Sequence, residues 1–465
     1  MFFKKFKSRA RMYVPNSVIL REYDVRGTYG LNLFMTDATW LGQHFGSLVF
    51  QNGGRKVVVC RDGRASSPAL HQHLCTALID CGLLVIDIGI GPTPMSYFAG
   101  HYLKADATLM ITGSHNPKDD NGIKITLDNQ SFFGNQIRDL GLQPFKLNVG
   151  GSYTDSSEEV FKAYAARLVL KKSGHLGLKR SLKIAWDSGN GASGPVVEAI
   201  TAMLPEHKHT LLFTEIDCNF PNHHPDPSVA ENLQHLIEAV RQHDCDVGFA
   251  FDGDGDRIGV VDSTGRIIAG DELVSIISVV ILSQAPGSTI IADVKCGSNT
   301  FKAIELAGGN AIMGRTGHSW VKKAMVEHSA AFAGEMSGHM FFKHNYYGFD
   351  DGLYAAVFLI DYIQSLDCSF SNIVSNLAKS YCTPEIRVEC SEESKFFIVE
   401  QIKQELIISG EPFKDIDGVR VEEPNGWWLV RASNTQSALI VRAEADTADN
   451  LQLILKKIKS FGLSI

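Results

Sequence analysis

Three stretches of the chain repeat one pattern, at residues 56–89, 183–217 and 288–319. Each opens with an apolar run rich in β-branched residues, places an Asp after it and a Ser or Thr before a helical repeat, and ends in a second apolar run or a Gly turn. The runs predict strands, and the 3.6-residue period between them predicts a helix. The repeat therefore indicates a βαβ unit used three times, which places the chain in the α/β class.

The end of the chain follows a different pattern. "PEIRVEC" (384–390) and "GWWLVRASNTQSALIVRAEA" (426–445) predict strands, the second stretch with a tight turn inside it, and "ADNLQLILKKIKS" (448–460) predicts an amphipathic helix. We expect a fourth domain of α+β type. A chain of 465 residues is too long for one core, and the domains predicted are 1–157, 158–265, 266–377 and 378–465.

Composition excludes several classes of function. The net charge of -8 leaves no basic footprint for nucleic acid, and the longest apolar stretch, 273–285, is shorter than the ~20 residues of a membrane-spanning helix. Nine cysteines without a C-x-x-C pair indicate neither a disulfide framework nor a zinc ribbon. The basic N-terminal segment lacks the apolar region of a signal peptide. We expect a cytoplasmic monomer with no nucleic-acid or membrane partner.

The stretch "FAFDGDGDRIGVVD" (249–262) places Asp252, Asp254 and Asp256 on a glycine-rich turn after an apolar strand. Glycine lets the backbone curl until the carboxylates face inward, and like charges this close repel unless a cation joins them. All-oxygen ligands favour Mg²⁺. An EF-hand calcium loop has similar spacing, but its twelfth position, normally Glu, is Ser263 here. An acidic surface turn is the plainer alternative, which the strands on both sides and Arg257 argue against.

The stretch "ITGSHNPKDDNGIKI" (111–125) is the end of an apolar strand followed by a forced turn with Ser114 at its tip. A serine in a turn is often only a loop cap. An acyl-transfer serine sits in G-x-S-x-G, which T-G-S-H-N does not match. A phosphoryl-transfer serine needs a cation and a proton-handling partner, and the triple-Asp turn and Lys124 supply candidates for both.

Two further loops carry polar side chains that suit a sugar phosphate. In "GEMSGHMFF" (334–342), we expect Glu335, Ser337 and His339 to form one polar row on an extended segment, suited to sugar hydroxyls. "RASNT" (431–435) lies at the turn between two apolar strands, where its donors suit a phosphate. Those donors are Arg431, Ser433, Asn434 and Thr435. An ordinary loop and an ordinary hairpin turn are the alternatives.

Three other motifs carry weaker signals. "YDVRG" (23–27) presents Tyr23 and Arg26 before a glycine, or simply a surface salt bridge. "GRTGHS" (314–319) places His318 at the start of a predicted helix, where it is as well suited to stabilising the loop as to catalysis. "HHPDP" (223–227) is interpreted as a rigid connector, because its prolines stiffen it and adjacent histidines on an extended chain point apart.

In this order, "REYDVRG", "TGSHNP", "DGDGDR", "GEMSGH" and "RASNT" resemble the motifs of the α-D-phosphohexomutase superfamily, most closely its bacterial phosphomannomutase/phosphoglucomutase branch. The resemblance spans nearly the whole chain. It implies three related α/β domains with mixed sheets and a C-terminal α+β domain resembling the TATA-box-binding protein. The four would form a heart shape around a central active-site cleft.

The same resemblance implies a role for each candidate residue. Ser114 would be a phosphoserine that binds Mg²⁺ together with Asp252, Asp254 and Asp256, and Lys124 would be the general acid/base beside it. We count four further residues with Ser114 and Lys124 as catalytic: Arg26, His115, Arg257 and His318. The substrate would be held by Tyr23, Lys295, Glu335, Ser337 and His339, and its distant phosphate by Arg431, Ser433, Asn434 and Thr435.

The implied reaction is phosphoryl exchange between the 1- and 6-positions of glucose and mannose phosphates, with hexose 1,6-bisphosphate as intermediate and activator. A mutase for glucosamine or N-acetylglucosamine phosphate is the nearest alternative. A sugar-phosphate phosphatase with the same serine and metal is a second alternative, and a non-enzymatic sugar-phosphate sensor is a third. Release of phosphate instead of isomerised product would identify the phosphatase.

Overall fold

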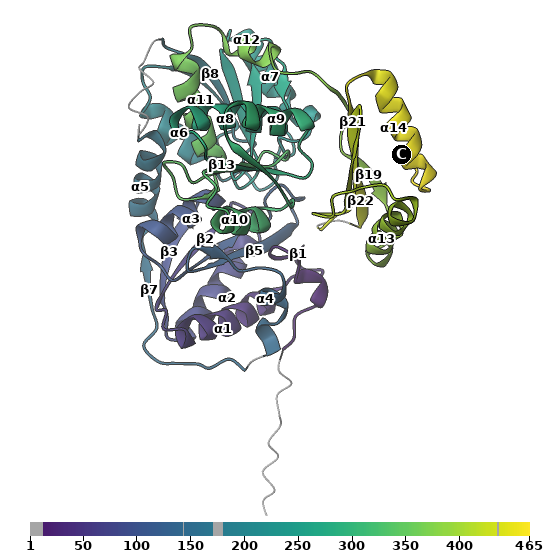
Figure 1. Cartoon of the computed structure of the whole chain (residues 1–465). Coiled ribbons are helices and arrows are strands. Elements are labelled where there is room, and N and C mark those ends of the chain that lie inside the picture. Colours follow the sequence, from purple (N-terminus) through teal and green to yellow (C-terminus); the bar gives the residue numbers. More distant parts are fainter. Residues whose placement is uncertain (1–12, 143, 171–179, 435–436) are drawn as a thin grey trace, which may run out of the picture.

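Each of the three repeated stretches folds as the predicted strand, helix and parallel strand (Figure 1). The computed structural model describes residues 13–142, 144–170, 180–434 and 437–465. The three βαβ units are β2 (Lys56–Arg61), α2 (Ser67–Asp80) and β3 (Leu84–Ile90); β8 (Lys183–Asp187), α6 (Gly194–Ala202) and β9 (Lys208–Leu212); and β13 (Thr289–Asp293), α9 (Ser298–Leu306) and β14 (Asn310–Gly314).

The first strand of each unit also pairs in parallel with a third strand, which turns back into an antiparallel partner. These strand pairs are β4 (Ala107–Ile111) with β5 (Asp120–Leu127), β10 (Val247–Phe251) with β11 (Ile258–Asp262), and β15 (Phe332–Gly334) with β16 (Met340–Phe342). The sheets are therefore mixed, as expected. The connecting loops 112–119, 252–257 and 335–339 occupy the same place in three related sheets, and they contain the three central sequence motifs.

The remaining elements complete the first three domains. In the first domain, β1 (Val25–Thr28) extends the sheet beside β5, and α1 (Met35–Gln51) packs on α2. The others there are η1 (Ser17–Ile19), α3 (Thr93–Tyr102), β6 (Gln130–Ser131), α4 (Asn135–Arg138), η2 (Leu140–Leu142) and β7 (Ser152–Asp155), and α5 (Ser157–Val169) leads into the second domain. The second domain adds η3 (Ala230–Leu233), α7 (Gln234–Gln242) and β12 (Ile267–Ile268). The third adds α8 (Gly270–Gln284), α10 (His318–Glu327), β17 (Phe349–Asp350), α11 (Gly352–Ser365) and α12 (Phe370–Ser375).

The last part of the chain is an antiparallel sheet with both of its helices on the side away from the other domains (Figure 1). Its strands are β18 (Tyr381–Cys382), β19 (Ile386–Glu389), β20 (Val419–Glu423), β21 (Gly426–Ala432) and β22 (Ala438–Ala445). Its helices are α13 (Glu392–Ser409) and α14 (Ala448–Ser460). The predicted strand pair and C-terminal helix are therefore confirmed. The predicted domain limits at 157, 265 and 377 stay predictions.

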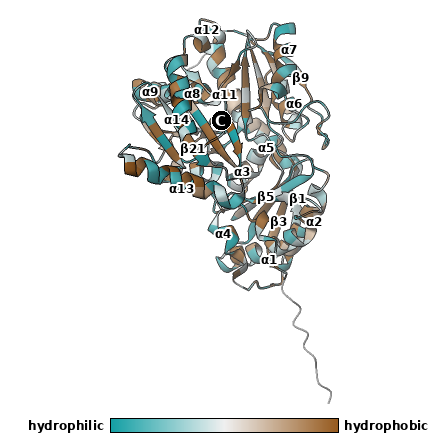
Figure 2. Cartoon of the chain, turned by 90° about the vertical axis from the view of Figure 1, so that its right-hand side faces the viewer, coloured by the Kyte–Doolittle hydropathy of each residue, from teal (hydrophilic) through white to brown (hydrophobic). Residues whose placement is uncertain are grey.

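Buried apolar side chains fill the space between this last sheet and its two helices, and a separate set of them packs the first three domains together. One buried cluster runs through parts of the first three domains, and a second lies between the C-terminal sheet and α13 and α14. Apolar residues accordingly line the strands of the sheets in Figure 2. In the part of the chain that the structure describes, no helix is both long and apolar enough to cross a bilayer.

Two arginines fasten the C-terminal sheet to the third domain. Arg420 on β20 donates to the carbonyls of Val294 and Cys296, at 2.7 Å each. Arg442 on β22 donates to the carbonyl of Lys295. The fully buried Trp427 lies between these guanidinium groups, whose centres are 3.8 and 5.6 Å from its ring. The C-terminal domain therefore holds the backbone of the loop that carries Lys295.

Candidate active site

Ser114 lies in the loop after β4, in a left-handed backbone conformation with φ +49°. Its N–H donates to Thr112 Oγ1 at 2.8 Å, and its Oγ donates to Asp252 Oδ2 at 2.8 Å. Only 4% of the residue is exposed. The hydroxyl of the predicted phosphoserine is therefore fixed on the first carboxylate of the predicted metal site, although 138 residues separate the two in the sequence.

Arg64, which the sequence interpretation missed, fixes the shape of this loop. Its guanidinium donates to the carbonyls of Ser114 and Asn116 at 2.7 Å each, and also to those of Pro117 and Asp120. Asp62 pairs with Arg64 Nε at 3.2 Å and accepts the N–H of Gly113 at 3.0 Å. A side chain at Gly113 would overlap the guanidinium, since its Cβ would lie 2.3 Å from Arg64 Cζ.

The three aspartates of the turn after β10 are fully buried. Lys124 Nζ lies 2.8 Å from Asp254 Oδ2 and 2.6 Å from Asp256 Oδ2. Burial raises the pKa of Asp252 well above its usual value, and the neighbouring carboxylates add to this effect. Burial alone would lower the pKa of Lys124, but Asp254 and Asp256 hold it well above its usual value. The carboxylates thus form a concentrated negative site that Lys124 partly neutralises.

These residues fit a divalent cation. Asp254 Oδ1 and Asp256 Oδ1 are buried and have no hydrogen-bond partner among the described residues. One oxygen from each of Asp252, Asp254 and Asp256 lies within 4.8 Å of the others, and hard carboxylate oxygens suit Mg²⁺. Thr93 at the start of α3 donates to Asp254 Oδ2 at 2.5 Å, so a first-domain residue also holds the metal turn in place.

Basic and imidazole groups surround the serine. Arg26 on β1 donates to the carbonyl of Gly113 at 2.7 Å and pairs with Asp24. His115 Nδ1 lies 3.1 Å from Ser114 Oγ. Burial lowers the pKa of His115 well below its usual value, and the charge of Arg257 lowers it further. Burial therefore favours the neutral imidazole of His115 beside the serine.

The loop 335–339 is a tight turn, so the predicted extended polar row is wrong. The N–H of Glu335 donates to the carbonyl of His339 at 2.9 Å, and that of Gly338 donates back to Glu335 at 3.0 Å. The two strands β15 and β16 are too close for an extended connection. Ser337 Oγ still donates to Glu335 Oε2 at 3.1 Å.

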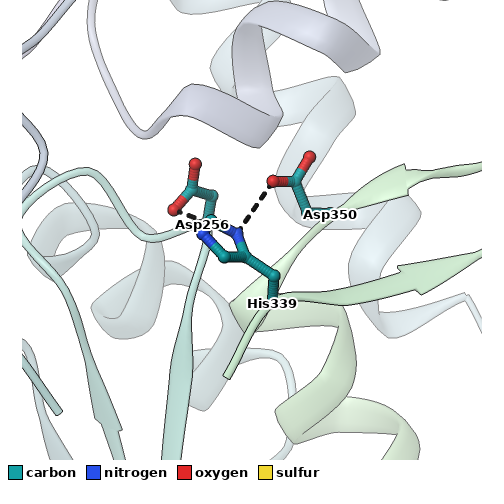
Figure 3. A group of neighbouring side chains, drawn as sticks. All are labelled: Asp256, His339 and Asp350. Carbon is teal, nitrogen blue, oxygen red and sulfur yellow. Dashed lines mark ion pairs between the residues drawn. The ribbon is translucent and has the colours of Figure 1, made fainter. Parts of the chain in front are cut away.

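His339 points toward two carboxylates (Figure 3). Its Nδ1 lies 2.9 Å from Asp350 Oδ2 and 3.6 Å from Asp256 Oδ1. Arg257 Nε donates to its other ring nitrogen, Nε2, at 3.0 Å. His318, the first residue of α10 as predicted, stacks on His339 with 6.0 Å between ring centroids. Burial lowers the pKa of His318 well below its usual value, and the charge of Lys322 adds to this shift.

The fourth group of predicted residues lies where three domains meet. Arg431 on β21 is buried, and its Nε donates to Asp417 Oδ2 at 2.9 Å. Asn434 donates to the hydroxyl of Tyr23, which itself donates to the carbonyl of Thr316 at 3.0 Å. The carbonyl of Ser433 accepts a hydrogen bond from Lys395. Thr435 lies outside the described residues.

Lys295 lies beside this group, in the loop after β13. Its Nζ pairs with Glu385 at 2.7 Å, and 5% of the residue is exposed. Burial would lower the pKa of Lys295, but Glu385 and Asp293 raise it above its usual value. A fixed cation at this position suits an anionic ligand.

The site therefore contains residues that no motif announced: Asp62, Arg64, Thr93, Asp226, Lys322, Asp350, Arg420 and Arg442. Asp226 comes from the "HHPDP" connector, where it lies 4.0 Å from Arg257. Two of the eight had a signal in the sequence, because Asp62 and Arg64 directly follow an apolar strand in "VVVCRDGR". Asp226 stands in a motif that was interpreted as a connector, and the remaining five have ordinary surroundings in the sequence and reach the site only through the fold.

The fold and the site together define a class: a protein of three α/β domains and one C-terminal domain with a serine, carboxylates and cations of the kind that phosphoryl transfer needs. Four models of the phosphoglucomutase/phosphomannomutase family match this chain: alpha/beta/alpha domains I, II and III at residues 17–139, 162–265 and 269–381, and the C-terminal domain at 385–460. The chain belongs to the phosphoglucomutase/phosphomannomutase family.

Individual relatives agree over nearly the full length. The chain is 41% identical over 448 residues to a phosphomannomutase/phosphoglucomutase from Pseudomonas putida, covering 95% of this chain and 94% of that one. It is 39% identical over 449 residues to a phosphoglucomutase from Neisseria gonorrhoeae, covering 95% and 96%. A solved structure of a phosphoglucomutase/phosphomannomutase family protein from Burkholderia thailandensis has a TM-score of 0.88 at 38% identity, covering 96% of this chain and 97% of that chain.

Proposed function

We propose that this chain is a hexose phosphate mutase that moves a phosphoryl group between the 1- and 6-positions of glucose and mannose phosphates. The observation that carries this proposal is the hydrogen bond of 2.8 Å from Ser114 Oγ to Asp252, one of three fully buried aspartates. A serine held on a cation site is placed to carry a phosphoryl group. Its relatives of about 40% identity bear the names of phosphomannomutases and phosphoglucomutases.

The reaction would run in two steps with no net loss of phosphate. The phosphoryl group on Ser114 passes to the free hydroxyl of the sugar phosphate. The P–O bond to serine breaks and a P–O bond to the sugar forms, the hydroxyl loses its proton and the serine oxygen gains one, and hexose 1,6-bisphosphate results. The bisphosphate turns over, and its other phosphate returns to Ser114. Mg²⁺ bound by Asp252, Asp254 and Asp256 would neutralise charge on the transferred group.

The residues around the serine have separate tasks in this scheme. Arg64 holds the serine loop by its carbonyls, and Arg26 and Arg257 supply positive charge near the transferred group. We assign the proton on the serine oxygen to Lys124, which shares Asp254 and Asp256 with the metal site. Glu335 and Ser337 would bind sugar hydroxyls. Lys295 and Arg431 would hold the phosphate that is not transferred.

A coupled assay tests the proposal directly. Glucose 1-phosphate and mannose 1-phosphate, each with a trace of hexose 1,6-bisphosphate, should both yield the 6-phosphate, and inorganic phosphate should not accumulate. Intact mass should show one phosphate that Ser114→Ala removes together with turnover. Stoichiometric phosphate release would identify a phosphatase, and turnover only of glucosamine or N-acetylglucosamine phosphate would identify the other mutase class.

The two sugars should be used with similar efficiency. Glucose and mannose differ only at the 2-hydroxyl, and a hydroxyl that no protein group must bind costs little when it is inverted. Glu335→Ala should accordingly lower turnover of both sugars by a similar factor. A preference of a hundredfold or more, about 2.7 kcal/mol, would mean that a protein group binds the 2-hydroxyl.

A further inference from the structure

Three buried atoms meet where the second and third domains touch. They are His339 Nδ1, Asp350 Oδ2 and Asp256 Oδ1, all within 4.8 Å of one another (Figure 3). None of the three has a hydrogen-bond partner among the described residues, although His339 Nδ1 lies at ion-pair distance, 2.9 Å, from Asp350 Oδ2. A buried polar atom without a partner is costly. Asp256 Oδ1 belongs to the predicted metal site, so His339 Nδ1 and Asp350 Oδ2 are left to satisfy each other.

The opposite end of each group is already held. Asp256 Oδ2 is held by Lys124 at 2.6 Å, and Asp350 Oδ1 by Lys322 at 3.3 Å. On the ring, Nε2 is held by Arg257 Nε at 3.0 Å. Because these contacts hold the other atom of each side chain, the three remaining atoms face one another. The residues involved come from five different segments of the chain.

The contact with Arg257 determines where the proton lies on His339. A guanidinium only donates hydrogen bonds, so Nε2 must be the acceptor and carries no proton. A neutral imidazole then has its proton on Nδ1, which is the nitrogen that faces Asp350 and Asp256. This tautomer suits the neighbours of both ring nitrogens, because Nε2 faces a donor and Nδ1 faces carboxylates.

The same argument weighs against a second metal ion. Two carboxylate oxygens and a ring nitrogen form a plausible ligand set for a transition metal. A metal on Nδ1 needs the lone pair of that nitrogen, and neutral imidazole has only one, which Nε2 uses to accept from Arg257. The distances seen here are those of a ring nitrogen paired with carboxylates, 2.9 Å from Asp350 and 3.6 Å from Asp256.

We propose that Asp350 is a positioning residue, which holds His339 in the Nδ1–H tautomer and keeps the lone pair of Nε2 available to donors in the site. In this structure the donor is Arg257. When Arg257 turns to a phosphate, a sugar hydroxyl of the substrate takes its place as the donor to Nε2. This inference rests on the proposed function for its substrate, but the position of the proton is a separate property of the protein.

Asp350 is better placed for this task than Asp256. Its oxygen is the nearer one, at 2.9 Å against 3.6 Å, and Asp256 belongs to the metal site. Burial alone would raise the pKa of Asp350, but Lys322 and His339 hold it well below its usual value. Asp350 also ends β17, which pairs with the strand β16 that begins next to His339, so the backbone fixes the distance between the two side chains.

Nitrogen-15 spectra of histidine in the Mg²⁺-loaded enzyme test the proposal without relying on activity. His339→Gln identifies the signals of His339 by their loss. The wild-type protein should show a protonated Nδ1 and an unprotonated Nε2, and Asp350→Asn should add or substitute the Nε2–H form, because an amide NH₂ facing Nδ1 cannot accept its proton. A wild-type His339 with a protonated Nε2, or a tautomer that Asp350→Asn leaves unchanged, would overturn the proposal.

Kinetics supply the second readout. Asp350→Asn should lower kcat by about tenfold to a hundredfold and change KM by less than about threefold, because orientation is lost while the sugar contacts remain. Asp351→Asn is the matched control, since Asp351 is the adjacent buried carboxylate but accepts from Tyr164 and Tyr346. It should keep kcat.

Equal loss of kcat in the two variants would make Asp350 merely structural and would overturn the proposal. Wild-type protein without mutase activity would instead refute the proposed function, while the spectra would still decide the role of Asp350.

Discussion

Ser114 owes its position to residues outside its own loop. Its left-handed conformation is strained for a residue with a side chain, and it is maintained because Arg64 binds the carbonyls around it while Asp252 accepts its hydroxyl. A loop held in this way would keep its shape while the phosphoryl group of the proposed reaction leaves and returns. The donors that fix it are already in place before the reaction begins, which is the condition for electrostatic stabilisation of a transferring group.

Arg64 should therefore affect both stability and turnover. Arg64→Met leaves the buried Asp62 without its cationic partner and removes one donor from each of four carbonyls, and it should cost about 3 kcal/mol in the free energy of unfolding and about tenfold or more in kcat. Arg64→Lys is the control, because it keeps the charge and loses the planar fork. It should recover part of the stability in urea denaturation but little of kcat. Full kcat in Arg64→Lys would contradict the role of the fork.

The metal site should be visible as a dependence of stability on Mg²⁺. Binding to the folded state alone stabilises it, by about 2.7 kcal/mol at a metal concentration a hundred times Kd. Thermal melting of the wild-type protein should therefore rise with added Mg²⁺ and fall again with chelator. Asp254→Asn, which removes one ligand, should lose most of this dependence and of kcat. A wild-type melting temperature that does not change with Mg²⁺, or activity of Asp254→Asn in chelator, would contradict the assignment of the three aspartates as a metal site.

At the scale of elements, the βαβ repeat carried the prediction of the fold. Apolar runs and helical periods are local properties, so the strands and helices of all three units were predictable where they occur, as were the C-terminal strand pair and helix. The conformation of loop 335–339 was predicted wrongly because the same polar residues occur in extended segments and in tight turns. Only the antiparallel pairing of β15 with β16 shows that this segment is a turn.

The residues of the candidate site divide in the same way. Ser114 and the three aspartates stand on turns after apolar strands, which the sequence displays. Thr93, Lys322 and Asp350 reach the site from helices and strands far away in the sequence, and nothing local marks them. A contact such as Thr93 with Asp254, across 161 residues, follows only from how the first two domains pack.

The N-terminus of α11 should make stability depend on pH. Burial raises the pKa of Asp351 to about 7, against 3.8 for a free side chain. The stability that Asp351 contributes is therefore fully present below about pH 3.8 and is lost as the pH rises through about 7. Asp351→Asn still caps Tyr354 but does not titrate. Its free energy of unfolding should improve relative to wild type by about 2 kcal/mol between pH 5 and pH 8. A difference that stays constant over that range would show that Asp351 is already ionised in the folded protein.

At the scale of the whole molecule, three related domains place equivalent loops at one point, and the fourth is held to the third by Arg420, Arg442 and Trp427. Under the proposed function, the repeated domain would serve three tasks with one architecture: a serine loop, a metal loop and a sugar loop. The C-terminal domain contains the residues predicted to bind the phosphate that is not transferred. Its Arg420 and Arg442 also hold the backbone around Lys295. A shift of the C-terminal domain would therefore move two of the predicted phosphate ligands together.

Tyr23 joins the first, third and fourth domains through one hydroxyl, which donates to Thr316 and accepts from Asn434. Tyr23→Phe removes both hydrogen bonds while keeping the ring, whose centroid lies 5.7 Å from that of His318. KM should rise about fivefold, as the loss of about 1 kcal/mol implies, and kcat should fall less. The looser contact should also release more hexose 1,6-bisphosphate before it has turned over, because closure of the domains is what retains it. Trapping of bisphosphate in the medium measures that release, and hydrogen exchange at residues 431–434 measures the loosening.

Tyr13→Phe is the control, since Tyr13 donates to Asp37 within the first domain and its loss should leave all three measurements unchanged. If Tyr23→Phe released no more bisphosphate than Tyr13→Phe, contact between the first and fourth domains at this hydroxyl would not be what retains the intermediate.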